Sequence, residues 1–186
     1  LAAEYCLINS FYRQDGRLSY SYGQISALGD FYDSPLEAYY ENGDNGFKED
    51  NIEKVFACMD KQGRTFKKQK EKPGVDLPGC DWVYLFNSPD FLRLVLGNAT
   101  HFAWYNMKAY VSAHTLAIRY ALNAYQAKSQ KQFARADEFM QQALYINAFA
   151  DHFLTDAFPA GHVRVPRDLL KNWAKKNLKG VFKGIR

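Results

Sequence analysis

Histidine and cysteine are scarce in this 186-residue chain, which has four histidines and three cysteines. The cysteines, at positions 6, 58 and 80, contain no CxxC pair, so the usual signature of a zinc ribbon or of a dithiol redox site is missing. Their odd number also excludes a fold built on a framework of disulfides. A single bond between Cys58 and Cys80 and a pair of buried free thiols both remain open.

Long apolar runs and sustained β alternation are absent as well. No stretch reaches the roughly 18 apolar residues that a membrane-spanning helix needs. The composition is 47% hydrophobic and 16% aromatic, which excludes a disordered chain. We therefore expect one globular domain over residues 1–186 with an all-α fold. The chain begins with "LAAEYCLINS" rather than with methionine, and we expect it to be processed or partial.

Two long segments have helical periodicity. From Thr100 to Lys128, apolar residues recur at steps of three and four, and a second such segment runs from Lys131 to Ala157. The stripe of the first consists of Trp104, Met107, Val111, Ile118, Leu122 and Tyr125. The stripe of the second consists of Phe139, Ala143, Ile146, Ala150 and Phe153, and it ends at Pro159.

Shorter helices are predicted nearer the start of the chain. "SYSYGQISALGDFYDSPLEAYY" indicates one or two short helices, with Ser21 or Tyr22 near the start. "SPDFLRLVL" indicates another, with Ser88 as its cap. Between Asn42 and Trp82, Gly, Asp, Lys and Pro are frequent, so we expect a long loop-rich insertion there.

Two of the four histidines lie close together, in the stretch "ADHFLTDAFPAGH". Their spacing is His152-x₃-Asp156-x₅-His162. Residues four apart share one face of a helix, so His152 and Asp156 can direct an imidazole and a carboxylate at one point, a ligand pair that suits zinc. On spacing alone, a core histidine beside a helix-end carboxylate is the commoner explanation of this pattern.

The surrounding sequence resembles the zinc-dependent phospholipase C and S1/P1 nuclease superfamily. "HFLTDAFPAGH" is similar to that family's HxxxD-x₅-H segment, and "GHVRVPR" looks like its phospholipase branch. "YGQISALGDFY" and "NATHFAWY" are similar to its segments with an early aspartate ligand and a histidine ligand. The resemblance implies an all-α helical bundle and a cluster of one to three zinc ions.

Carried over residue by residue, the resemblance implies five metal ligands. One site would consist of Asp30, His101, His152 and Asp156, with Asp156 shared with a second ion and His162 in a further site. Asp30 would also be catalytic, as the residue that orients or deprotonates the attacking water. The family has further histidine ligands, but here no histidine precedes His101 or follows His162. Either pieces of the chain are missing, which we favour, or the cluster is reduced.

The resemblance implies a secreted or exported enzyme that cleaves phospholipid head groups at a membrane surface. An S1/P1-type nuclease acting on single-stranded nucleic acid is the first alternative. The second is a non-catalytic helical domain with a residual metal site, which binds a membrane or a partner through its basic tail. Apolar residues lie at mostly helical spacing among the lysines of that tail, at Leu170, Trp173, Leu178 and Phe182. Two further expectations are that His114 is a packing or surface residue and that Arg164 or Arg167 either anchors a phosphate or lies on the surface.

Overall fold

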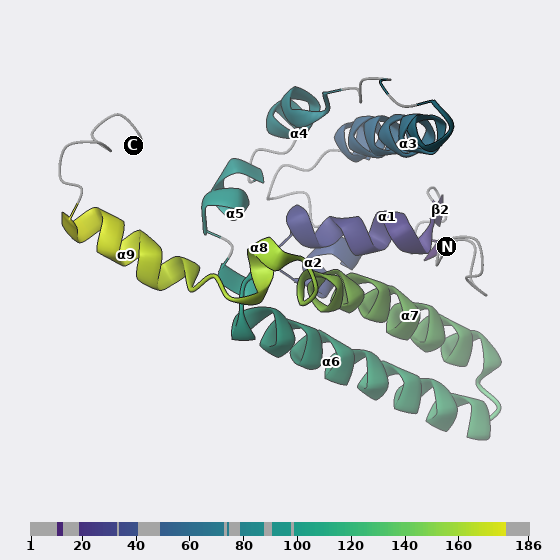
Figure 1. The fold of residues 1–186 in the computed structure, drawn as a ribbon. Helices are drawn as coiled ribbons and strands as arrows, with labels where there is room; N and C mark the ends of the chain where they lie inside the picture. The colour runs from purple at the N-terminus through teal and green to yellow at the C-terminus, as the bar shows by residue number, and fades with distance from the viewer. Residues whose placement is uncertain are drawn as a thin grey trace. The chain divides into compact units, whose positions relative to one another are not determined.

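The protein is described by a computed structural model that covers residues 11–12, 19–32, 34–40, 49–72, 74, 79–87, 91–97 and 99–177. The chain divides into two compact units, Leu1–Gly97 and Asn98–Arg186. The described residues are mostly helical, which confirms the all-α prediction (Figure 1). No described helix is long and apolar enough to span a bilayer.

The first unit begins with a two-residue antiparallel pair, β1 (Phe11–Tyr12) and β2 (Ser19–Tyr20). It continues through short helices joined by turns. These are α1 (Tyr22–Ala27), the 3-10 turn η1 (Leu28–Asp30), α2 (Pro35–Tyr40), α4 (Asp81–Asn87) and α5 (Phe91–Gly97), with the long α3 (Glu49–Glu71) between α2 and α4.

The predicted start of α1 is confirmed by its capping. The Ser21 hydroxyl accepts a hydrogen bond from the backbone N–H of Gln24, and the Gln24 side chain accepts one from the backbone N–H of Ser21. This capping box satisfies two backbone donors that a helix start otherwise leaves unpaired. The predicted cap at Ser88 lies outside the described residues.

The prediction of a loop-rich insertion between Asn42 and Trp82 was wrong, because α3 occupies much of it. Gly63, one of the glycines of this stretch, lies inside the helix among lysines, glutamines and a glutamate that favour helix. One internal glycine costs only about 1 kcal/mol relative to alanine. Val55 and Phe56 lie two turns before Gly63. Their buried side chains anchor the helix to the core of its unit.

A disulfide joins α3 to the segment before α4. Cys58 and Cys80 are bonded with their Cα atoms 6.0 Å apart, so of the two possibilities left open by the sequence the bridge is the one present. Cys80 is fully buried, and the bond encloses a loop of 22 residues. Closing this loop restricts the unfolded chain and so stabilises the first unit.

The second unit is built on a helical hairpin. Figure 1 shows α6 (Trp104–Ser129) and α7 (Phe133–Asp156) lying antiparallel, and they pack along their lengths. Three smaller elements complete the unit: the 3-10 turn η3 (Ala99–His101) before α6, and α8 (Ala160–Val163) and α9 (Arg167–Asn177) after α7.

The connection of the hairpin is a Schellman motif, in which the backbone of Lys131 is left-handed with φ 60°. The N–H of Lys131 donates to the carbonyl of Lys128, and the N–H of Gln132 donates to the carbonyl of Ala127. These two hydrogen bonds satisfy carbonyls that the end of α6 would otherwise leave unpaired. The motif turns the chain back sharply and sets α7 beside α6.

The hairpin packs through alanines, not through the apolar stripe predicted on its first helix. Trp104, Val111, Ile118, Leu122 and Tyr125 are exposed, between 48% and 80%. The buried face of α6 instead carries Ala113, Ala117, Ala124 and Ala127, and α7 contributes Ala136, Ala143 and Ala150. The small side chains of this alanine seam let the two helices approach closely.

Of the stripe predicted on α7, Ala143, Ile146, Ala150 and Phe153 are buried and Phe139 is half-buried.

Candidate metal centre

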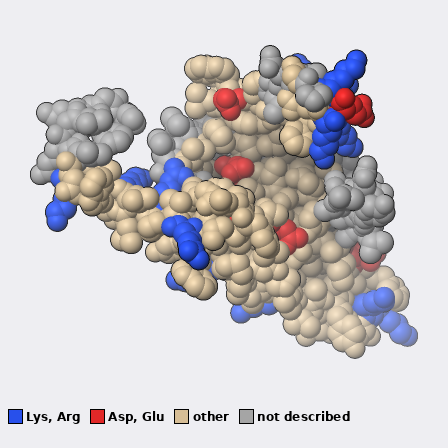
Figure 2. Space-filling view, viewed as in Figure 1, with Lys and Arg blue, Asp and Glu red and all other residues tan. Residues whose placement is uncertain are grey.

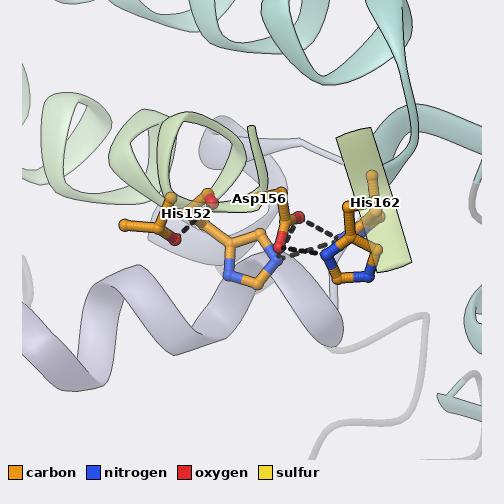
Figure 3. A network of polar contacts seen from close by, with 5 residues as sticks. His152, Asp156 and His162 are labelled. Atoms are coloured by element: carbon orange, nitrogen blue, oxygen red, sulfur yellow. Dashed lines mark hydrogen bonds and ion pairs between the residues drawn. The ribbon is translucent and has the colours of Figure 1, made fainter. Parts of the chain in front are cut away.

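Three elements of the second unit bring histidines to one end of the hairpin. His101 is the last residue of η3, His152 lies in the last turns of α7, and His162 lies on α8. Asp156, the last residue of α7, is buried among them. Figure 3 shows His152 and Asp156 projecting from α7 toward the same point while His162 faces Asp156.

One carboxylate oxygen of Asp156 lies against two imidazoles. Its Oδ2 is 2.8 Å from Nδ1 of His101 and 3.4 Å from Nε2 of His152. Those two ring nitrogens are 3.0 Å from each other. Nδ1 of His101 carries at most one hydrogen, and that hydrogen cannot point at both of its partners.

These separations fit the ligands of a small divalent ion. Ligands about 2.0–2.1 Å from a tetrahedral zinc lie about 3.3 Å from one another. The three distances among Oδ2 and the two ring nitrogens, from 2.8 to 3.4 Å, are close to that value. A cation among the three atoms would accept a lone pair from each. His101 and His152 can therefore hold a metal ion.

The second oxygen of Asp156 faces the third histidine. Oδ1 lies 3.4 Å from Nδ1 of His162, within the range of an ion pair. This Nδ1 is buried and has no hydrogen-bond partner among the described residues. A buried ring nitrogen without a hydrogen bond calls for an explanation, and an unassigned ion is one of the recognised ones. The carboxylate thus directs one oxygen at each of two possible ion positions.

The backbone holds His162 in place. The turn at Pro159 carries the chain from α7 into α8, where the N–H groups of His162 and Val163 donate to the Pro159 carbonyl. The N–H of Ala103 donates to the carbonyl of His162 at 2.8 Å. Ala103 has φ 51°, which is unfavourable for a residue with a side chain. Strained backbone of this kind is concentrated at functional sites.

Phe102 is part of this site, a role that its sequence context does not predict. Its ring lies edge-on to His162, with centroids 4.6 Å apart, and the Arg167 guanidinium lies over it at 4.7 Å from the centroid. The ring therefore limits the motion of the imidazole and ties the start of α9 to the site. Nothing in the sequence marks Phe102 except that it directly follows His101.

His114 lies apart from this cluster. Its Nδ1 is 2.7 Å from Oδ1 of Asn147 on α7, and its ring stacks on Tyr110. Asn147 in turn donates to Asp151 at 3.5 Å. His114 therefore belongs to a polar contact between the two helices of the hairpin, in line with the packing role predicted for it.

Asp30 belongs to the other unit, where it ends η1 between the buried residues Gly29 and Phe31. Its carboxylate affects Tyr84 in the same unit. Burial raises the pKa of Tyr84 above its usual value, and the negative charges of Asp81 and Asp30 raise it further. The Tyr84 hydroxyl donates to Oε1 of Gln62 at 3.1 Å.

The chain matches no known protein family, no curated protein and no solved structure.

Proposed function

We propose that the protein is a metal-dependent phosphodiester hydrolase of the phospholipase C type, with zinc as its metal. The observation that carries the proposal is the position of Asp156, whose two oxygens face separate histidines. A buried carboxylate arranged in this way is suited to bridge two cations. Bridged pairs of divalent ions are typical of enzymes that cleave phosphate esters.

In this proposal His101, His152 and Asp156 hold one ion, and Asp156 and His162 contribute to a second. Asp30 completes the first set, as its place in "YGQISALGDFY" implies. The four residues of the second unit have the donor types that zinc prefers, imidazole nitrogen and carboxylate oxygen. The buried ring nitrogen of His162 supports the second position.

Bound divalent ions would supply a water of lowered pKa and would stabilise the charge that develops on the phosphate. Asp30 would orient the attacking water and accept its proton. Phe102 would hold the imidazole of His162 in position, and the Arg167 guanidinium above that ring would attract an anionic substrate.

We further propose that the protein is exported. The support is the bond between Cys58 and Cys80, since disulfides persist mainly in oxidising compartments.

The test combines metal content with turnover on matched substrates. The purified protein is expected to retain zinc by elemental analysis and to release phosphorylated head groups from phosphatidylcholine vesicles. Chelation should abolish this turnover, and zinc should restore it. Turnover of single-stranded DNA without turnover of phosphatidylcholine would favour the nuclease alternative. A zinc-loaded protein that cleaves neither substrate, nor a soluble phosphodiester, would contradict the proposal.

A further inference from the structure

The helix that follows the metal centre exposes an apolar face. On α9 the side chains of Leu169, Leu170 and Trp173 are 69%, 51% and 58% exposed. At about 100° per residue they share an arc of roughly 100° on one side of the helix. Figure 1 shows α9 leading away from the α6–α7 hairpin, which agrees with this exposure.

The rest of α9 is strongly basic. It carries four basic residues and one acidic residue, namely Arg167, Lys171, Lys175, Lys176 and Asp168. On the helical wheel Lys171 and Lys175 lie away from the apolar arc, and Lys176 borders it. Figure 2 shows Lys and Arg side chains at several points along the arm formed by this helix. A helix with an apolar stripe and a positively charged remainder is complementary to a surface with negatively charged outer groups over an apolar interior.

We propose that α9 binds an anionic phospholipid bilayer and lies in its interface, with Leu169, Leu170 and Trp173 in the acyl boundary. Lys176, which borders the apolar arc, can then place its ammonium group at the level of the head groups while its stem extends along the apolar face. Lys171 and Lys175 face the water and add electrostatic attraction to the anionic surface. Tryptophan is favoured at this depth. The Leu178 and Phe182 positions of the predicted tail lie outside the described residues and are not needed for this surface.

Three other exposed apolar residues lie at the end of the hairpin that carries the candidate metal centre. Trp104 begins α6, Phe158 follows the end of α7, and Val163 ends α8, and they are 80%, 77% and 42% exposed. Arg167, the first residue of α9, lies over Phe102, whose ring contacts His162. The bilayer contact is therefore joined to the candidate metal centre by two successive side-chain contacts.

The inference does not depend on hydrolysis, because α9 makes the lipid contact and none of the candidate metal ligands lies on it. The test uses the full chain with its metal removed by a chelator, so that turnover cannot alter the vesicles. Binding is measured by co-sedimentation with vesicles of phosphatidylcholine mixed with phosphatidylglycerol, and with vesicles of phosphatidylcholine alone. The variant is Leu170→Gln/Trp173→Gln. The matched control is Leu122→Gln/Tyr125→Gln, which removes two exposed apolar side chains from the other end of α6.

The parent and the control are expected to bind the anionic vesicles, and to bind less as salt is added. The α9 variant should bind at least about tenfold more weakly, since it loses most of the buried apolar area. Circular dichroism of both variants shows whether they remain folded. Absence of parent binding, an equal loss in the control, or salt-independent binding that is the same for both vesicle types would overturn the proposal.

A second measurement applies even if the α9 variant does not fold. Replacing Trp82 and Trp104 by Phe leaves Trp173 as the only tryptophan, because the sequence has three. Its emission should shift to shorter wavelength when anionic vesicles are added. An unchanged spectrum would overturn the placement of Trp173 in the bilayer.

Discussion

Oδ2 of Asp156 lies 2.8 Å from Nδ1 of His101, although the two residues are 55 positions apart in the chain. The contact joins the end of α7 to the turn that precedes α6, and both side chains are almost fully buried. Burying a carboxylate costs free energy unless the group is paired, so the Asp156 carboxylate needs a hydrogen-bonding or positively charged partner.

Replacing His152 by Ala should remove at least one equivalent of zinc. Its Nε2 is one of the three donor atoms that converge near Oδ2 of Asp156. His114→Ala is the matched control, since His114 is also a histidine of the hairpin but contacts Asn147 instead. Elemental analysis of both variants after dialysis against limiting zinc measures the difference. Equal zinc content in the two variants would refute the ligand assignment.

Asp156→Asn should be worse for activity than His162→Ala. Asparagine retains the volume and one oxygen but removes the negative charge that two cations would share, so both ion positions are weakened. Loss of His162 weakens only the position near Oδ1. Metal-stripped protein is titrated with zinc, and turnover of a soluble phosphodiester is then followed. If Asp156→Asn binds as much zinc as the parent and turns over normally, the shared-ligand idea fails.

Removing the disulfide should destabilise the first unit by about 3 kcal/mol, the amount that closing a loop of 22 residues is expected to contribute. Thermal unfolding of Cys58→Ser measures this, with Cys6→Ser as control because Cys6 is not part of the bond. Reduction of the parent should reproduce the effect of Cys58→Ser. Unfolding temperatures that do not differ between the two serine variants would contradict the prediction.

The raised pKa of Tyr84 should make the stability of the first unit depend on alkaline pH. Burial and the charges of Asp81 and Asp30 favour the neutral phenol in the folded state. The contribution is therefore complete below the unfolded pKa of about 10 and is lost as the pH rises through the higher folded pKa. Tyr84→Phe should weaken this alkaline loss. At neutral pH it should cost about 1 kcal/mol, because the hydrogen bond to Gln62 is removed.

The measurement is the free energy of unfolding of parent and Tyr84→Phe at neutral and alkaline pH, together with a spectroscopic titration of tyrosinate. The difference between the two titrations should show a phenol that ionises above the usual range. If the phenol that Tyr84→Phe removes ionises in the parent at or below the usual tyrosine pKa, the prediction is contradicted.

Lys131→Gly should stabilise the hairpin by about 1 kcal/mol. The left-handed backbone of Lys131, at φ 60°, is unfavourable for lysine and free of strain for glycine. Lys128→Gly is the control, because Lys128 lies in the last turn of α6, where glycine lowers helix stability. Chemical denaturation should shift in opposite directions for the two variants, and a shift in the same direction would count against the role assigned to the motif.

The two long helices of the second unit could be predicted from the sequence because their apolar pattern continues over many turns and because Pro159 ends the second helix. The sequence did not predict which face of α6 is buried. That helix has an apolar stripe of large side chains and a second face of alanines, and periodicity favours the larger residues. The alanine face is buried instead, since only small side chains allow α6 and α7 to pack this closely.

Helical spacing predicted that His152 and Asp156 lie together, whereas His101 and Asp30 were predicted as ligands only through the resemblance of short motifs. Within the second unit the structure brings His101, His152, Asp156 and His162 together, and Asp30 is a residue of the first unit. The division of the Asp156 oxygens between partners could not be predicted, because it depends on the turn at Pro159. The role of Phe102 depends on contacts with residues far along the chain.

The alanine seam bears on which ions the centre would accept. His101 precedes one helix of the hairpin and His152 lies on the other, so the separation of their rings depends on the separation of the helix axes. A larger side chain at Ala117 would push the helices apart and widen the space between the imidazoles without altering any ligand. Discrimination between zinc and larger divalent ions would thus be set along the seam as well as at the ligands, and residues that never touch an ion would contribute to metal selectivity.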